Sequence, residues 1–570
     1  MDIISPMAKY LITSALPYAN GPIHFGHIAG AYLPADIFNR FLRQSGDESL
    51  YICGTDEHGV AITINAEKAG IPYKEYVDKY HAEIKAFFDK LDIRFDHFSR
   101  TTIPAHYPLA QEFFTDLYKK GHIAAAVEKQ FFCVKCDRFL ADRYVSGSCP
   151  KCNAPNVRGD ECTVCGEWLE PSKIVSPSCK VCGSKPEIRE STQYFLDLPS
   201  FEPKLKAWLE SKTDWKPNVR NKALSMINEG LVKRAITRDL TWGVPVPLDE
   251  AKGKVLYVWF EAPIGYVSAT MEWAEKQGKP EAWKDWWFDK NSKLVHFIGK
   301  DNIVFHTIIW PALIMGQDKP YILPDNVPGN EFYNLEGKQF SKSEGWYIDT
   351  ADFFSKYSVD ALRYAIASNA PETADSQFTW EGFQASNNEL ADTLGNLVNR
   401  CFSFMKKNFD GKIPAQGELK DEDKALMDLF APAFAETGGF YREYKVRQAA
   451  SRAMALAIAA NKYVNDTAPW ALRKTDIVRC ATVLNVASRA IINAAVLLYP
   501  IVPSTALKIL AKAGLPAADA APAFKPFEGS LDGVTLGEDA SLLFAKILPE
   551  QVKAEVEKMR EIAEAAAAKK

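Results

Sequence analysis

Apolar and polar positions near the start of the chain follow the pattern of an α/β fold. Residues 9–15 and 49–53 form two short apolar runs that predict buried strands, and apolar positions recur at helical spacing across residues 23–43. Polar residues follow the second run at residues 54–58. A strand, a helix and a second strand with polar residues at the strand ends predict a parallel sheet with a ligand site at its carboxyl edge.

The pattern changes at residue 122. From there to residue 233 the sequence carries cysteine pairs and turn residues with few long apolar periods, which indicates an insertion. Strand-like runs return at residues 255–259, 294–298 and 321–323, and an apolar stretch over residues 303–315 predicts an intervening helix. We therefore expect the sheet to resume after the insertion.

Beyond residue 380 only helical periodicity remains. It runs over residues 389–405, 421–445, 449–466 and 478–498, which predicts an all-α helical bundle domain. Residues 551–570 are rich in Ala, Glu and Lys and predict a helical tail or linker. The expected fold class is therefore α/β: a parallel-sheet domain split by an insertion and followed by an all-α bundle.

Length and composition narrow the class of protein. A chain of 570 residues implies about three to five domains. With 47% hydrophobic and 25% charged residues it is an ordinary globular sequence, which excludes fibrous and largely disordered proteins. No apolar run reaches the length of a membrane helix and the N-terminus has no secretory signal pattern, so we expect a cytoplasmic protein without a membrane partner. Because the net charge is −4, any nucleic-acid partner must be held locally.

Eight of the eleven cysteines form four C-x-x-C pairs. Each pair in a tight turn can direct two thiolates at one ion, and tetrahedral zinc accepts four, so the pairs predict two closed sites with a structural role. We favour a nested arrangement, in which the two inner pairs form one site and the two outer pairs the other. The inner ligands are Cys149, Cys152, Cys162 and Cys165, and the outer ligands are Cys133, Cys136, Cys179 and Cys182.

Two segments have the chemistry to handle a nucleotide. His24 and His27, with Gly26 between them, stand where the first strand gives way to a helix, whose N-terminus attracts phosphate oxygens. Much later, Ser341, Lys342 and Ser343 form a Gly-flanked loop that suits a departing pyrophosphate. Either segment alone is weak evidence, because a short H-x-G-H arises by chance and most lysine-serine loops are only solvated.

Seven segments in order carry a family resemblance. ALPYANGPIHFGH, ICGTDEHG, ITRDLTWGVPVP, YVWFEAPIGY, FIGKDN, FSKS and APW resemble the methionyl-tRNA synthetases, a family of class I aminoacyl-tRNA synthetases whose two signatures are written HIGH and KMSKS. The resemblance extends from about residue 9 to residue 548. Three positions depart from the family pattern: Gln339 replaces the first Lys of KMSKS, Glu344 replaces a frequent Arg, and Asn302 replaces a frequent Ile.

The resemblance implies a role for individual residues. His24, His27 and Lys342 would be catalytic. The ATP-binding set would be His24, Gly26, His27, Lys300, Asp301, Ser341, Lys342 and Ser343. The methionine-binding set would be Ala15, Leu16, Tyr18, Asp56, Trp259, Ala262, Pro263, Tyr266 and His306, with Asp56 taking the substrate ammonium. Asn399 and Trp470 would contact the anticodon, where an aromatic ring can stack on an unpaired base.

The resemblance also implies six regions and a set of partners. Residues 1–121 and 234–330 would be the two halves of a Rossmann-like catalytic domain, residues 122–233 the connective-peptide insertion with two zinc knuckles, residues 331–388 the KMSKS-loop region, residues 389–548 the anticodon-binding domain and residues 549–570 the tail. The partners would be ATP with magnesium, L-methionine and tRNA(Met), together with about two structural zinc ions. We expect the chain to be monomeric.

Two other functions fit parts of the sequence. An H-x-G-H nucleotidyltransferase that makes a small coenzyme would share His24 and His27, but the length, the cysteine-rich insertion and the helical domain argue against it. A non-catalytic RNA-binding relative is suggested by Gln339 and Glu344. The expected reaction is ATP-dependent activation of methionine to methionyl-adenylate, followed by transfer to the 2′-hydroxyl of the terminal adenosine of tRNA(Met).

Overall fold

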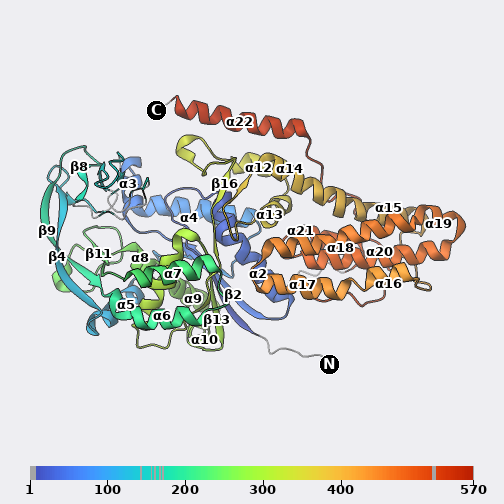
Figure 1. The fold of residues 1–570 in the computed structure, drawn as a ribbon, viewed down its shortest axis with the longest axis horizontal. Helices are drawn as coiled ribbons and strands as arrows, with labels where there is room; N and C mark the ends of the chain where they lie inside the picture. Colours follow the sequence, from blue (N-terminus) through green and yellow to red (C-terminus); the bar gives the residue numbers. More distant parts are fainter. Residues whose placement is uncertain are drawn as a thin grey trace.

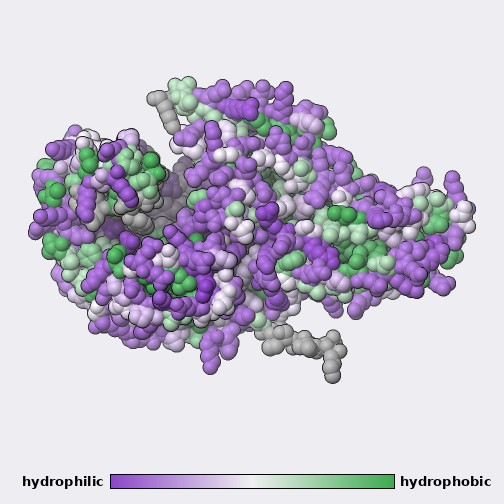
Figure 2. Space-filling view, in the orientation of Figure 1, coloured by the Kyte–Doolittle hydropathy of each residue, from purple (hydrophilic) through white to green (hydrophobic). Residues whose placement is uncertain are grey.

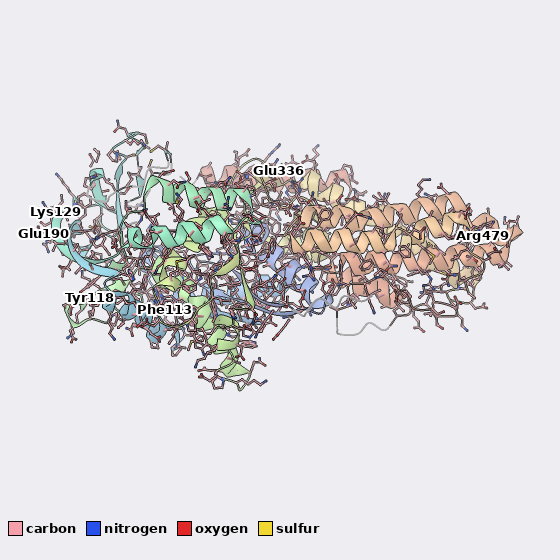
Figure 3. All side chains as sticks on the ribbon, turned by 60° about the horizontal axis from the view of Figure 1, so that its bottom comes forward. Phe113, Tyr118, Lys129, Glu190, Glu336 and Arg479 are labelled. Carbon is pink, nitrogen blue, oxygen red and sulfur yellow. The ribbon has the colours of Figure 1, made fainter. Side chains whose placement is uncertain are left out.

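The chain forms an elongated molecule with a β-rich lobe at one end and a helical bundle at the other (Figure 1). The computed structural model describes residues 8–568 apart from 142–143, 156, 159–161, 163, 166–168, 170–172 and 516–520. Lys129 and Glu190, which pair across two long strands, mark the β-rich end, and Arg479 lies near the opposite end (Figure 3).

A parallel sheet forms the centre of the catalytic domain, as expected from the sequence. Its strands lie in the order β14-β13-β1-β2-β3, and every neighbouring pair is parallel. The central strand β1 has a buried, apolar sequence, which is typical of a strand covered on both faces. The strand bounds are β1 Lys9–Ser14, β2 Glu48–Thr55, β3 His97–Arg100, β13 Ser292–Gly299 and β14 Pro324–Asn326.

The helix predicted over residues 23–43 is continuous but changes its winding. It starts as α1 (Phe25–His27), passes through the π-helical turn η1 (Ile28–Tyr32) and ends as α2 (Leu33–Gln44). The other helices of this domain are α3 Val60–Ala69, α4 Tyr73–Lys90, α5 His106–Lys119, α8 Val258–Glu261, α9 Gly265–Lys276, α10 Lys284–Trp287, α11 Trp310–Met315, α12 Thr350–Lys356 and α13 Val359–Ser368.

The insertion is built on a long antiparallel pair, β4 (Ile123–Cys133) and β9 (Glu187–Leu196). β10 (Arg234–Ala235) extends this sheet beside β9 and β5 (Arg138–Phe139) beside β4, while β6 Val145–Ser148, β7 Val157–Arg158 and β8 Val175–Cys179 form a second small sheet. Two helices that follow, α6 (Glu202–Ser211) and α7 (Pro217–Glu229), bury their apolar residues in the core of the catalytic domain.

Two of the predicted strands were wrong. In residues 255–259 only β12 (Val255–Leu256) is a strand, and it pairs with β11 (Thr237–Arg238) outside the main sheet. Trp259 therefore lies on helix α8, where the local apolar run is helical rather than extended. Residues 321–323 do not form a strand either. The edge strand of the sheet is formed by the next three residues, β14.

The helical domain confirms the helical periodicity of the sequence. Its longest members are α18 (Val446–Thr467) and α20 (Ile477–Leu498). Helix α20 is apolar enough to cross a membrane by composition, but 89% of its most apolar stretch is buried inside the protein, so it is the core helix of the bundle. The remaining helices are α14 Trp380–Glu389, η10 Leu390–Gly395, α15 Asn396–Asn408, α16 Asp421–Met427, α17 Phe430–Arg442, α19 Pro469–Thr475 and α21 Pro503–Lys512.

The last helix, α22 (Pro549–Ala567), returns from the bundle toward the catalytic domain and lies along α12 and α14 (Figure 1). Its Glu555 carboxylate accepts a hydrogen bond from Lys356 at 2.8 Å. The helix also meets the turn η9 (Lys342–Glu344), and a Cβ atom added to Gly345 would lie 2.7 Å from the carbonyl oxygen of Ile562. The predicted tail is therefore a docked helix.

A buried ion pair joins the two domains. Arg363 on α13 donates to Asp36 on α2 at 2.6 Å, and the same guanidinium donates to the carbonyl oxygens of Pro500 and Ile501 between α20 and α21. Both side chains are at most 1% exposed. Burial alone would raise the pKa of Asp36, but the guanidinium groups of Arg40 and Arg363 hold it below its usual value.

Substitution of Arg363 by Met should lower the free energy of unfolding by about 3 kcal/mol, because Asp36 keeps only its Arg40 ion pair and the buried carbonyl oxygens of Pro500 and Ile501 lose their donor. Urea-induced unfolding measures this loss. Arg442→Met is the matched control, since Arg442 also bridges the domains, to Asp47 at 3.0 Å, but is 47% exposed. We expect a change below about 1 kcal/mol there. Equal losses in the two variants would contradict the role given to Arg363.

Candidate functional site

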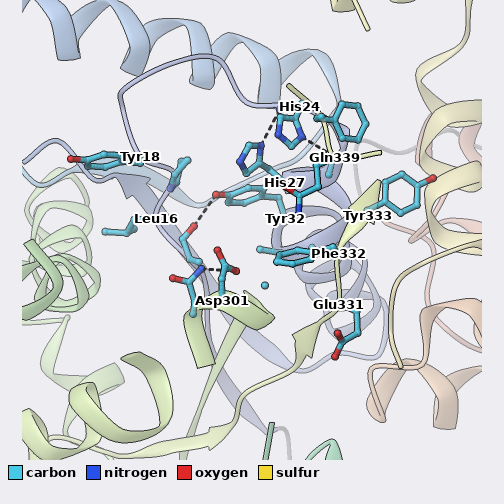
Figure 4. A pocket seen from close by; sticks show the side chains of 18 of the residues that line it. Leu16, Tyr18, His24, His27, Tyr32, Asp301, Glu331, Phe332, Tyr333 and Gln339 are labelled. Atoms are coloured by element: carbon cyan, nitrogen blue, oxygen red, sulfur yellow. Dashed lines mark hydrogen bonds between the residues drawn. The ribbon is translucent and has the colours of Figure 1, made fainter. Parts of the chain in front are cut away.

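A cavity of about 360 Å³ lies at the carboxyl edge of the parallel sheet (Figure 4). It forms where β1 and β13 end, which is the position predicted for a ligand site. The predicted residues in its wall are Ala15, Leu16, Tyr18, His24, Gly26, His27, Trp259 and Asp301. Figure 2 shows a mostly hydrophilic surface around the catalytic domain, with a hollow beside the β-rich lobe.

His24 and His27 are held in one protonation pattern by the backbone. The Gly26 amide donates to Nδ1 of His24 at 3.2 Å, and the His24 amide donates to Nδ1 of His27 at 3.1 Å. Because an amide only donates, each Nδ1 is an acceptor, and the proton of each neutral ring lies on Nε2. Burial and the neighbouring His27 lower the pKa of His24 to about 2, so His24 is neutral at pH 7. The two rings are stacked obliquely with centroids 3.8 Å apart.

The lysine-serine loop meets the cavity through a different residue from the one predicted. Phe340 stacks on the His24 ring with centroids 4.5 Å apart, and Gln339 and Phe340 both line the cavity. Among the described residues, Ser341, Lys342 and Ser343 do not line it: they form the exposed turn η9 and the residue before it. The structure thus brings the loop to His24 without bringing Lys342 there.

The predicted methionine-binding residues divide into two groups. Ala15, Leu16, Tyr18 and Trp259 line the cavity, whereas Asp56, Ala262, Pro263, Tyr266 and His306 are buried behind that wall. The Tyr266 hydroxyl lies 2.8 Å from Nε2 of His306. Trp259 stacks on Phe305 with centroids 4.0 Å apart, which closes one side of the cavity with aromatic surface.

Asp56 is a buried carboxyl without a cationic side chain in contact among the described residues. Its backbone pairs with the chain at Tyr18, and its Oδ1 accepts a weak 3.4 Å hydrogen bond from the His58 amide. Burial and the nearby Glu261 carboxylate raise the pKa of Asp56 well above its usual value. An ammonium group placed beside Asp56 would lower the pKa of Asp56 again, because it favours the ionised carboxylate.

Lys300 and Asp301 follow β13 directly but face different surroundings. Lys300 forms ion pairs with Asp375 at 2.6 Å and Glu331 at 2.8 Å. Asp301 lines the cavity, and burial raises its pKa. Asp301 therefore faces the cavity itself, while Lys300 is part of its rim.

Sequence reasoning missed several wall residues. Tyr32 donates to the carbonyl oxygen of Ala15 at 2.9 Å and lines the cavity from η1. Phe332 and Tyr333, at the start of β16 (Tyr333–Leu335), form the part of the wall next to the histidine turn (Figure 4). The two adjacent aromatic residues, flanked by polar residues over positions 330–334, were the available signal, but no spacing rule linked them to His24.

The eight paired cysteines form two clusters in the nested arrangement predicted from their spacing. Within the clusters, sulfur–sulfur distances of 3.4 Å (Cys133–Cys182) and 3.6 Å (Cys152–Cys162) are close to the roughly 3.8 Å edge of a tetrahedral zinc-thiolate site. All four ligand atoms of each cluster lie within 4.8 Å of one another. The donor set and the spacing fit zinc, and with four thiolates neither cluster keeps an open position.

The predicted anticodon residues lie in the helical domain. Asn399 is on α15, where its Oδ1 accepts a hydrogen bond from Ser403 at 3.0 Å. Trp470 is the second residue of α19 and is 44% exposed, so it is not a packed interhelical residue. The guanidinium of Arg400 lies 4.9 Å from the centroid of the Trp470 ring, which joins the two helices at this surface.

A split parallel sheet with an H-x-G-H helix start, a distant lysine-serine loop and an appended helical bundle defines a class I aminoacyl-tRNA synthetase. Residues 10–402 match the family described as tRNA synthetases class I (M), and residues 413–563 match the anticodon binding domain of methionyl tRNA ligase. The chain therefore belongs to the methionine–tRNA ligases.

Individual relatives agree with this assignment. The chain is 48% identical to the methionine–tRNA ligase of Thermococcus kodakarensis over 516 residues, which are 88% of this chain and 70% of that protein. It is 44% identical to the enzyme of Bacteroides fragilis over 555 residues, with 96% and 80% covered. The solved Mycobacterium tuberculosis methionyl-tRNA synthetase in complex with methionyl-adenylate has a TM-score of 0.78 at 27% identity, covering 94% of this chain and all of that one.

Asp56→Asn should stabilise the unliganded protein at pH 7. The raised pKa of Asp56 means that folding disfavours its ionised form, so its contribution to stability falls as pH rises above about 3.9, the unfolded value. Differential scanning calorimetry should show a melting temperature higher by about 2–4 °C, the shift that about 1 kcal/mol produces in domains of 150–250 residues.

Asp36→Asn is the control with the opposite sign. Its pKa is lowered in the folded state, so its stabilising effect is present at pH 7 and is lost only as pH falls through that lowered value. Lowering the pH toward 4 should remove the gain from Asp56→Asn and leave the loss from Asp36→Asn. Destabilisation by Asp56→Asn at pH 7 would show that its carboxylate is satisfied in the free protein.

Proposed function

We propose that this chain condenses L-methionine with ATP to methionyl-adenylate and transfers the methionyl group to the 2′-hydroxyl of the terminal adenosine of tRNA(Met). The observation that carries the proposal is the juxtaposition, at one sheet edge, of two imidazoles with Nε2 donors and a buried carboxyl, Asp56. The imidazole N–H groups can donate to the triphosphate oxygens, and the Asp56 carboxylate can bind the ammonium group of an amino acid.

The methionine site is formed by the cavity wall and the residues behind it. Trp259 and Tyr266 offer aromatic surface, which suits a flexible thioether, and Ala262 and Pro263 close the pocket without polar groups. Asp56 receives the substrate ammonium. The charge of that ammonium compensates the buried carboxylate, so binding and ionisation of Asp56 favour one another.

The first chemical step needs positioning and charge stabilisation rather than a base. The methionine carboxylate is already ionised at pH 7, and one of its oxygens attacks the α-phosphorus of ATP. The new oxygen–phosphorus bond forms as the bond to the β-phosphate oxygen breaks, and magnesium pyrophosphate leaves. His24 and His27 donate from Nε2 to phosphate oxygens as negative charge develops.

Lys342 contributes after a movement of its loop. In the structure Phe340 covers the His24 ring and Lys342 lies on the exposed turn η9. When ATP occupies the cavity, Phe340 leaves His24, and the turn brings Lys342, with Ser341 and Ser343, to the pyrophosphate. Gly26 permits close approach of the β16 backbone to the histidine turn, because a Cβ atom there would lie 2.8 Å from the carbonyl oxygen of Tyr333.

We assign zinc to both cysteine clusters as a structural ion. Zinc held by four thiolates crosslinks chain segments that have little apolar core of their own, and its contribution is to folding. The support is the sulfur geometry of the outer cluster, Cys133, Cys136, Cys179 and Cys182, and of the inner cluster, Cys149, Cys152, Cys162 and Cys165.

The helical domain is the proposed tRNA-reading surface. Exposed Trp470 offers a face for stacking on an anticodon base, and Asn399 offers an amide for its edge. Arg400 beside the Trp470 ring adds a cation for the backbone. The six-region division, the monomeric state and the cytoplasmic location stay predictions from the sequence.

Lys342→Ala should slow adenylate formation by about 100-fold or more, because a charge that acts on the departing pyrophosphate is lost. Methionine-dependent exchange of pyrophosphate into ATP measures the step, and the KM for methionine should be nearly unchanged. Trp470→Ala is the control at the other end of the molecule: it should keep exchange and weaken tRNA charging. A wild-type protein without exchange would support the non-catalytic RNA-binding alternative.

Elemental analysis of the purified protein should return about two zinc ions per chain. Cys152→Ser should remove one ion and Cys182→Ser the other, since each belongs to a separate cluster, whereas Cys480→Ser, a buried cysteine of the helical domain, should keep both. One ion in the wild type, or loss of both ions from a single substitution, would contradict two independent sites.

A further inference from the structure

One carboxylate and two imidazoles form a buried cluster, the Glu261 cluster, made of Glu261, His58 and His106. Oε1 of Glu261 lies 2.9 Å from Nδ1 of His58, and its Oε2 lies 2.6 Å from Nε2 of His106. The three side chains are at most 1% exposed. Sequence reasoning gave none of them a role, although Glu261 stands between Trp259 and Ala262 in the chain.

The two halves of the proposed methionine site come from distant parts of the chain. Asp56, which receives the substrate ammonium in the proposed function, directly follows β2 and precedes the insertion. The apolar wall comes after the insertion, from α8 and the 3₁₀ turn η6 (Ala262–Ile264), which carry Trp259 and Pro263. One segment therefore holds the ammonium end of the substrate, and another holds its side chain.

His58 contacts both segments. Its backbone amide donates to Oδ1 of Asp56 at 3.4 Å, and its ring bonds Glu261, the last residue of α8. The next residue, Gly59, packs directly on the same helix, because a Cβ atom there would lie 3.3 Å from Cβ of Val258. The bond between His58 and Glu261 thus spans 203 positions of the chain and joins the ammonium end of the site to its apolar wall.

The ionised Glu261 sets the donors of the cluster. Burial alone would raise the pKa of Glu261, but His58 and His106 hold it below its usual value, so the carboxylate is ionised at pH 7. An ionised carboxylate only accepts, so Nδ1 of His58 and Nε2 of His106 both carry protons. The other two ring nitrogens lie 3.1 Å from the Tyr107 hydroxyl and 3.0 Å from the Ser268 hydroxyl. Each ring nitrogen and each carboxylate oxygen therefore has a partner.

His106 fixes the second oxygen of the carboxylate. It begins α5, and its ring also contacts Ser268 on α9, so the bond to Glu261 ties α8 to two further helices. Hydrogen bonds to an ionised group are strong, and a buried charge that loses one is costly. Helix α8 therefore cannot move away from the end of β2 without breaking bonds that water does not replace.

We propose that Glu261, His58 and His106 are positioning residues that set the length of the side chain that the methionine site accepts. They fix the apolar wall at one distance from Asp56. A substrate longer than methionine by one methylene must then displace a packed wall to keep its ammonium at Asp56. This inference rests on the proposed function, because it assigns the residues that support the proposed methionine site.

His58→Leu tests the cluster, because it keeps a buried side chain of moderate size and removes the donor to Glu261. The probe is L-ethionine, which is methionine lengthened by one methylene, in amino-acid-dependent pyrophosphate exchange. The wild-type chain should prefer methionine at least about tenfold in kcat/KM, and His58→Leu less than about threefold. The KM for ATP should stay within about twofold of wild type, since the ATP site is not touched.

His58→Asn should restore the wild-type preference, because the asparagine amide nitrogen can take the place of Nδ1. His97→Leu is the matched control: Nε2 of His97 lies 2.7 Å from Oε2 of Glu272, but that pair joins β3 to α9 rather than Asp56 to α8. We expect it to keep the wild-type preference. An unchanged preference in His58→Leu, or an equal fall in His97→Leu, would overturn the inference.

Histidine ¹H–¹⁵N spectra of the unliganded wild-type chain at pH 7 give a second readout that does not require His58→Leu to fold. They should show a proton on Nδ1 of His58 and on Nε2 of His106, with His58→Asn and His106→Gln used for assignment. Absence of either proton would overturn the inference while leaving exchange intact. A wild-type chain without methionine-dependent exchange would instead overturn the proposed function, and this inference with it.

Discussion

The arrangement of the two large domains depends on one buried charge pair, Asp36 with Arg363. The carboxylate lies on the helix that follows His24 and His27, and the guanidinium also binds the turn between α20 and α21 of the bundle. Both groups are inaccessible to water, so separating them would leave the buried Arg363 guanidinium without its counter-ion, while Asp36 would keep Arg40. The orientation of the helical domain is thereby linked to the same helix that carries the candidate catalytic site.

The composition of the site follows from the geometry of a parallel sheet, whose strands all end at the same carboxyl edge. Successive strands end side by side there, so β1 and β13 place His24 and Asp301 around one cavity, and β2 places Asp56 in the buried layer behind the cavity wall. Backbone amides then set the protonation of the two imidazoles.

Local patterns predicted much of this structure. The parallel sheet, the helical bundle and the nested cysteine clusters were predicted from periodicity and spacing, because buried strands and helices have characteristic patterns of apolar residues and zinc has a fixed ligand geometry. The predicted strand over residues 255–259 was wrong because an apolar run of five residues has no period that separates strand from short helix.

Long-range contacts lay beyond the same reasoning. The stacking of Phe340 on His24 joins residues more than three hundred positions apart, and nothing in either segment indicates which loop residue reaches the ring. The cavity wall formed by Phe332 and Tyr333 could not be predicted either. Its strand, β16, pairs in parallel with β17 (Ser376–Phe378) and not with the main sheet.

Helix α22 gives the molecule a mechanical property that no single domain has. It is attached to the bundle at one end and rests on the turn that contains Lys342 and on Gly345 at the other. The bundle is therefore connected to the other domain in two ways, through the covalent chain and through the contact of α22 with the turn. Force applied at the turn is therefore shared with the bundle, and a rotation between the domains also displaces the helix that rests on the turn.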